Sequence, residues 1–161
     1  MKASVVLLAI LSMPTFVHAG ACDGADHRAF DFWIGDWDVT NAANSKHTRN
    51  VITREYDGCV IHERYTGPSG YTGESLNTFD ANRHVWHQTW VDSQGGLLVL
   101  EGGVHDRKMV LEGQQTDKDG HKTRQRITWT PNADGTVRQL WESTNPDGTW
   151  MTSFDGVYRK K

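Results

Sequence analysis

The chain has 161 residues, a formal net charge of −3 and two cysteines, and charges of both signs are interspersed along it. This length allows one domain to bury a substantial apolar core without a structural metal or several disulfides. The small net charge and the lack of a basic block argue against nucleic acid as a partner.

The first 19 residues have the pattern of a secretory signal peptide. Lys2 supplies a positive start, residues 3–17 are mostly apolar, and Ala19 ends a small-residue stretch typical of a cleavage site. The apolar run is short for a membrane-spanning helix, and no later segment is apolar enough to form one. We therefore expect residues 20–161 to form one domain that is periplasmic or secreted.

Export would place Cys22 and Cys59 in an oxidising compartment, where a disulfide between them is the economical expectation. Such a bond would tie the N-terminal lead-in to the hairpin that contains Cys59. Acylation of Cys22, as in a lipoprotein, is an alternative. However, residues 19–21 lack the leucine-like residue that usually stands three places before an acylated cysteine.

Residues 30–39 combine a short helical turn with the start of a strand. Phe30 and Trp33 would share one side of the turn. Gly35 lets the backbone change direction, and the alternation over residues 37–40 begins a strand. Large aromatic residues just after such a turn suit a plug that closes one end of a barrel.

Short alternating segments, separated by turn residues, then follow to the C-terminus. Asp57-Gly58 is a strong hairpin dipeptide, and residues 132–135 and 145–148 have equally clear turn chemistry. About nine or ten strands at this spacing predict an antiparallel sandwich or barrel. An up-and-down β-barrel is favoured because closure removes exposed strand edges. The predicted strands after residue 50 span residues 51–56, 60–66, 74–79, 85–92, 97–101, 110–112, 124–130, 137–143 and 150–159.

Gly35-Asp36-Trp37 is similar to the Gly-x-Trp signature at the start of calycin barrels, the superfamily of lipocalins and fatty-acid-binding proteins. That resemblance implies that Trp37 lies at the barrel floor with an Arg or Lys of the last strand across it, and Arg159 matches this partner. The longer string FDFWIGDWDV, with WHQTWVD and FDGVYRK, resembles a family of exported bacterial proteins of unknown function, usually placed with lipocalin-like folds. This closer resemblance spans nearly all of the chain after the leader.

Strand alternation assigns each side chain to the interior or the exterior of the predicted barrel. In the last strand, Trp150, Thr152, Phe154 and Tyr158 would share a face. Buried polar groups are costly unless hydrogen-bonded, and aromatic walls with a few convergent polar groups suit a small-molecule pocket. A closed core in which Trp and Gln satisfy one another is the alternative. The predicted ligand-binding residues are Glu63, Asn77, Trp86, Gln88, Trp90, Trp129, Gln139, Trp141 and Tyr158.

Three functions remain open for this interior. The first is the binding of a small, partly apolar molecule that is aromatic or hydroxylated. The second is an isomerase or hydrolase that uses Glu63 as acid or base, and the third is a structural or interaction protein with a filled core. Catalysis is less favoured than binding because the sequence contains neither a nucleophile elbow nor a phosphate-binding glycine loop.

No metal or other cofactor is expected. His84 and His87 stand three residues apart, so on a strand they would face opposite ways. A resemblance to the haem-binding nitrobindins would require a histidine late in the chain, but the last one, His121, follows a turn glycine. The expected partner is a small-molecule ligand, and the expected state is a monomer or homodimer without a membrane span.

Overall fold

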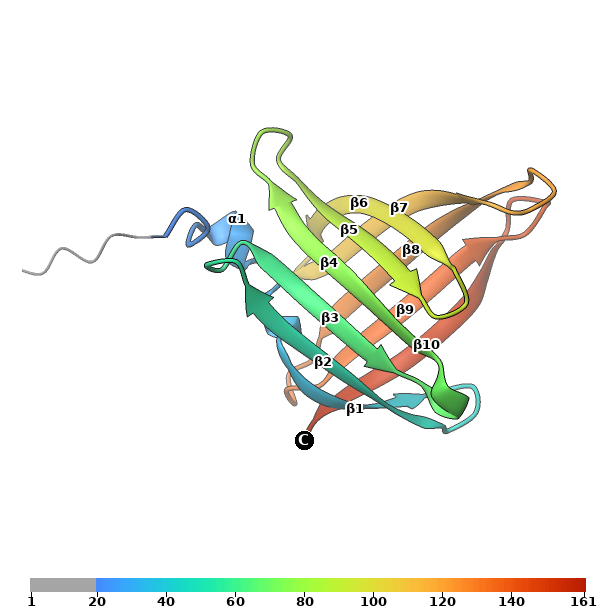
Figure 1. The fold of residues 1–161 in the computed structure, drawn as a ribbon, viewed down its shortest axis with the longest axis horizontal. Helices are drawn as coiled ribbons and strands as arrows, with labels where there is room; N and C mark the ends of the chain where they lie inside the picture. The colour runs from blue at the N-terminus through green and yellow to red at the C-terminus, as the bar shows by residue number, and fades with distance from the viewer. Residues whose placement is uncertain (1–19) are drawn as a thin grey trace, which may run out of the picture.

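Ten antiparallel strands close into a barrel in the computed structural model, which describes residues 20–161 (Figure 1). The predicted signal peptide lies outside the described residues. Neighbouring strands in sequence are neighbours in the sheet, and β1 (Gly35–Asn41) closes the barrel against β10 (Trp150–Lys160). The predicted up-and-down barrel is therefore confirmed. The predicted helical turn is present as the 3-10 helix η1 (Asp31–Trp33), and a helix that was not predicted, α1 (Ala25–Arg28), precedes it.

Most strands extend beyond their predicted limits. The clearest case is the hairpin of β6 and β7, whose pairing continues to His105 and Lys108. Asp106 and Arg107 form its turn with positive φ at both residues and without a glycine, so the usual sequence signal is missing. The remaining strands and a second 3-10 helix are β2 (His47–Glu55), β3 (Val60–Thr66), η2 (Pro68–Gly70), β4 (Thr72–Asp80), β5 (Val85–Asp92), β6 (Leu97–His105), β7 (Lys108–Thr116), β8 (Lys122–Pro131) and β9 (Val137–Thr144).

The N-terminal segment covers one end of the barrel, which we call the closed end (Figure 1). Phe30 and Trp33 are fully buried there and stack with ring centroids 4.9 Å apart. The predicted Cys22–Cys59 disulfide ties this segment to the turn between β2 and β3, and it leaves no Cys22 thiol for acylation. The opposite end, which carries η2 and the β9–β10 turn, is the open end. Within residues 20–161, no helix is long and apolar enough to cross a membrane.

Trp37 is fully buried at the closed end, where its Nε1 donates to the carbonyl of Trp33 at 2.9 Å. A Cβ on Gly35 would lie only 3.0 Å from the Trp37 ring, so this glycine makes room for the indole. The cation over the ring is Lys160, with its Nζ 5.2 Å from the ring centroid. The prediction of Arg159 in this place is wrong, because adjacent residues of a strand face opposite sides.

A β-bulge in β10 changes which side chains face inward. The pairing with β9 shifts between Thr152 and Phe154, so that Ser153 is the extra residue. Phe154 faces the interior as predicted, but Trp150 lies on the exterior, where its ring centroid is 4.2 Å from the guanidinium carbon of Arg126. The predicted shared face is therefore wrong for Trp150 and Thr152, because one inserted residue inverts the alternation.

Candidate functional site

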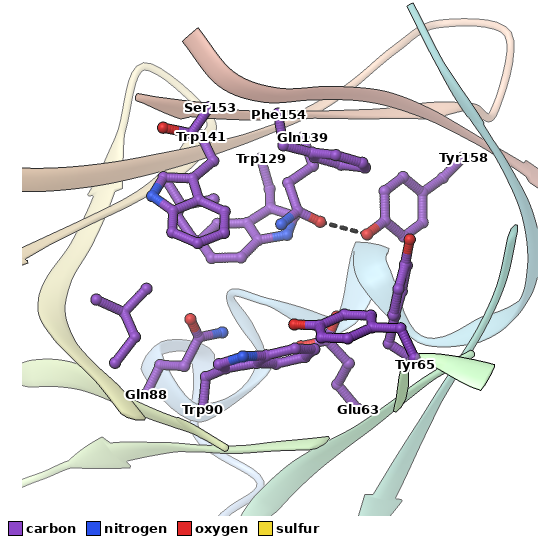
Figure 2. A pocket seen from close by; sticks show the side chains of 13 residues that line it. Glu63, Tyr65, Gln88, Trp90, Trp129, Gln139, Trp141, Ser153, Phe154 and Tyr158 are labelled. Carbon is purple, nitrogen blue, oxygen red and sulfur yellow. Dashed lines mark hydrogen bonds between the residues drawn. The ribbon is translucent and has the colours of Figure 1, made fainter. Parts of the chain in front are cut away.

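A pocket of about 190 Å³ extends into the barrel from the open end (Figure 2). Ten strands enclose a wider interior than eight strands, whose inward side chains just fill the space or leave room for one small ligand. An engineered cavity of about 150 Å³ in another protein binds benzene, so this pocket suits a six-membered ring with a short substituent. Its walls are formed by Glu63, Tyr65, Tyr71, Gln88, Trp90, Leu98, Ile127, Trp129, Gln139, Trp141, Ser153, Phe154 and Tyr158.

Two indole rings, Trp90 of β5 and Trp141 of β9, approach the pocket from opposite sides (Figure 2). Trp90 Nε1 donates to Asp92 Oδ2 at 3.3 Å, and Trp141 Nε1 donates to Gln125 Oε1 at 2.8 Å. Because these N–H groups are bound within the protein, the carbon surfaces of the rings remain to contact a ligand. Gly73 of β4 lets Trp90 lie flat against the sheet, since a Cβ at this position would overlap the indole ring.

The mouth of the pocket is organised by Asp92. Its Oδ2 accepts the hydroxyl of Tyr71 at 3.0 Å, and its Oδ1 accepts the backbone N–H groups of Gln94 and Gly96. The backbone hydrogen bond from Gly96 is the main cause that lowers the pKa of Asp92. Burial and the bond to Asp92 raise the pKa of Tyr71 to about 12. At neutral pH the mouth thus carries an ionised carboxylate that holds the polar atoms of Tyr71 and Trp90.

Deeper in the pocket, buried polar side chains form a continuous hydrogen-bonded chain centred on Glu63 of β3. Its Oε1 accepts Asn50 Nδ2 at 2.7 Å, and its Oε2 accepts Ser75 Oγ at 2.6 Å. Asn50 Nδ2 also donates to the hydroxyl of Tyr158 at 3.1 Å. That hydroxyl donates in turn to Gln139 Oε1, as the dashed line in Figure 2 marks. Asn50 therefore joins the carboxyl group to the tyrosine.

The chain continues from Ser75 toward β5. Ser75 Oγ accepts Asn77 Nδ2 at 2.9 Å, and Asn77 Oδ1 accepts Gln88 Nε2 at 2.7 Å. From Gln88 to Glu63, every donor therefore points toward the carboxyl group, an orientation that suits an ionised carboxylate. Burial nevertheless raises the pKa of Glu63, and the hydrogen bonds from Ser75 and Asn50 offset this only in part. Burial and the neighbouring Glu63 also raise the pKa of Tyr158 well above its ordinary value.

The pocket contains one acidic side chain and no basic one. Among its lining residues, all within the described part of the chain, Glu63 alone is ionisable to a charge near neutral pH. The next residue, His62, faces the exterior, where its ring nitrogens contact Glu55 and Glu74. The site is thus an aromatic cavity with a single buried carboxyl group and no protein cation beside it.

Comparison with known families agrees with the extent of this barrel. Residues 23–160 match the family described as Protein of unknown function (DUF1579). The chain belongs to this family. No curated protein matches the chain. Membership of this family is thus established, whereas the similarity to calycins remains a resemblance noted in the sequence. The family description states no activity.

Most of the residues predicted to bind a ligand lie around the pocket of this family member, and two do not. Asn77 is buried in the wall behind Gln88. Trp86 packs at the closed end against Phe30, and its Nε1 donates to the carbonyl of Asp26 at 3.2 Å. Ligand binding by the predicted residues remains a prediction. The predicted residues that line the pocket are Glu63, Gln88, Trp90, Trp129, Gln139, Trp141 and Tyr158.

The sequence analysis missed several residues of the site, among them Asn50, Ser75 and Tyr71. Asn50 lies before the predicted strand at residues 51–56, so alternation was not applied to it, although β2 already begins at His47. Ser75 could have been found, because it has the same parity in β4 as Asn77. Tyr71 lies between η2 and β4, where strand alternation assigns no side.

Proposed function

We propose that this protein binds a small, partly apolar molecule in the pocket at the open end of the barrel. The observation that carries the proposal is a space of about 190 Å³ between aromatic walls and a buried polar chain. Packed protein interiors leave few voids larger than a water molecule. Apolar concave sites with a few converging polar groups are the usual form of ligand sites.

Unsatisfied polar atoms beside the pocket support the same function. Trp129 Nε1 and Asn50 Oδ1 are buried and have no hydrogen-bond partner within residues 20–161. Buried polar groups in folded proteins are normally paired, if necessary with ordered water or a ligand. Trp129 itself lines the pocket, so an acceptor on a bound molecule can satisfy its N–H. This favours a ligand that joins an apolar ring to a polar substituent.

We further propose that the protein works outside the cytoplasm, in the periplasm or after secretion. The Cys22–Cys59 disulfide supports this location, because disulfides persist mainly in oxidising compartments. The predicted signal peptide and the sequence resemblance to lipocalin-like exported proteins point in the same direction.

Tryptophan fluorescence of the protein without residues 1–19, titrated with fractions of a small-metabolite extract, tests the proposal. We expect saturable quenching or a spectral shift that is lost in Trp90→Ala, whose ring lines the pocket. Trp150→Ala is the matched control, because that ring lies on the exterior. Circular dichroism establishes that both variants fold, and mass spectrometry identifies the bound compound. Equal responses in both variants, or no response to any fraction, would contradict binding in the pocket.

Acid–base catalysis by Glu63 is a second candidate. It is favoured by the raised pKa of a carboxyl group that lines an accessible pocket, which is a common property of catalytic acids and bases. Incubation of the identified ligand with the protein distinguishes the two functions. An enzyme converts the compound, and Glu63→Gln abolishes conversion while binding survives. A binding protein returns the compound unchanged.

The third function, a structural protein with a filled core, is less well supported. The exterior does expose apolar side chains on neighbouring strands, namely Leu76, Val91 and Leu97. However, the interior contains the pocket beside its packed core, whereas this alternative predicts no space there.

A further inference from the structure

We propose that the ligand is a small organic ammonium ion, with its charged nitrogen against Glu63 and its apolar body between Trp90 and Trp141. This inference rests on the proposed binding function and specifies the chemical class of the ligand. It comes from three properties of the pocket: the unpaired carboxyl group, the aromatic walls and the charge at the mouth.

The first property is that Glu63 has hydrogen-bond donors but no counter-ion among residues 20–161. Its side chain is only 4% exposed, and its two oxygens accept Asn50 and Ser75, which are both neutral. A buried carboxylate is strongly destabilised unless an opposite charge accompanies it. Each carboxylate oxygen can accept a further hydrogen bond, so an ammonium group can bind without displacing Asn50 or Ser75. A cationic ligand would therefore supply what the protein lacks.

The second property is the aromatic enclosure. The faces of indole and phenol rings attract cations, and groups of such rings are a known means of binding alkylammonium ions. Trp90 and Trp141 already use their N–H groups on Asp92 and Gln125, so their rings offer no competing donor to the ligand. Gln88 also donates through its Nε2 to Asn77, and Figure 2 shows its amide directed into the cavity. The oxygen of this amide is thus left as an acceptor for the charged group, and the unpaired Trp129 Nε1 is left for an acceptor such as water.

The third property is the sign of the charge at the mouth. Asp92 holds the rings of Trp90 and Tyr71 by their polar atoms, and its lowered pKa keeps it ionised. A positively charged ligand is attracted by this carboxylate on its way in, and an anion is repelled by it. The pocket volume limits the ligand to about the size of a substituted benzene ring.

The test compares three probes of nearly equal size: benzylamine, which is protonated at pH 7.5, neutral benzyl alcohol and anionic benzoate. Affinities for the folded protein without residues 1–19 are measured by calorimetry. We expect benzylamine to bind about tenfold more tightly than benzyl alcohol, and benzoate not to bind. Glu63→Gln should remove the preference for benzylamine. Glu74→Gln, which removes the same charge from the exterior face of the adjacent β4, should keep it.

The outcomes separate this inference from the proposed function. If benzyl alcohol binds as tightly as benzylamine, the pocket binds small molecules but the ammonium assignment is wrong. If the preference survives in Glu63→Gln, or if benzylamine does not bind at all, the assignment is also wrong. Binding in general is then judged by the extract titration. Should Glu63→Gln fail to fold, the order of the three probes on the unaltered protein decides by itself.

Discussion

Removal of the Cys22–Cys59 disulfide should weaken the fold by an amount that the length of the closed loop sets. The two cysteines are separated by 37 positions, and in the chain-entropy model a cross-link of this span restricts the unfolded chain by roughly 4 kcal/mol at 25 °C. Neither cysteine is a paired strand residue, since Cys22 precedes the strands and Cys59 lies in the turn between β2 and β3. The double variant Cys22→Ser, Cys59→Ser should therefore fold into the same barrel, with a free energy of unfolding lower by about 4 kcal/mol.

Urea unfolding followed by circular dichroism measures this loss. With a slope of about 2 kcal/mol per molar urea, the midpoint should fall by about 2 M. The slope itself should rise slightly, because the unlinked unfolded chain exposes more surface. Unaltered protein treated with a reductant serves as the control and should match the double variant. A loss below about 1 kcal/mol in a two-state transition would refute the loop argument. In that case the bond would only anchor α1 and η1 locally.

Two further predictions concern the pocket. Gly73→Ala should cost about 1–3 kcal/mol and displace Trp90, because the new methyl group overlaps the indole, and urea unfolding and tryptophan fluorescence report both effects. Gly103→Ala is the control, since a Cβ there meets nothing within 4 Å; equal losses would contradict the reasoning. Glu63 has a raised pKa in the folded state, so the stability that its neutral form supplies is complete below its ordinary pKa and is lost as the pH rises through the folded value. Urea unfolding between pH 4.5 and 8 should therefore show Glu63→Gln gaining stability relative to unaltered protein as the pH rises. Glu55→Gln should instead stay parallel to unaltered protein over this range, because bonds to Arg64, His62 and Thr53 lower the pKa of Glu55 to about 2 and its stability contribution changes only below its ordinary pKa. Parallel curves for the two variants would refute the assignment.

The fold was predictable because hairpin signals divide the chain into strands of regular length, and alternation then assigns most side chains. Gln88, Trp129 and Gln139 were placed inward on parity alone, and they lie there. Parity fails at Trp150 because nothing in the local sequence marks the bulge at Ser153. It fails at Asn50 for a different reason, since this residue precedes the stretch that was recognised as a strand.

Contacts between distant segments were harder to predict than the direction of single side chains. The sequence resemblance placed a cation over Trp37 but chose Arg159, whereas the register of β1 with β10 sets Lys160 opposite the tryptophan. The pairing of Cys22 with Cys59 was predictable because no other cysteine competes. The chain of donors that ends on Glu63 requires the register of several strands at once, and no single-strand pattern contains it.

The barrel separates the residues that hold it together from those that meet a ligand first. The plug formed by Phe30 and Trp33, together with the disulfide, lies at the closed end, and five hairpin connections lie at the other. Strand pairing is complete below those connections, and loops away from a core tolerate changes of length and sequence. The loops at the open end can therefore change in length and sequence while the strands and the closed end stay the same. A library of variants that changes only the loops at residues 67–71 and 93–96 would be a direct way to give this barrel new binding preferences.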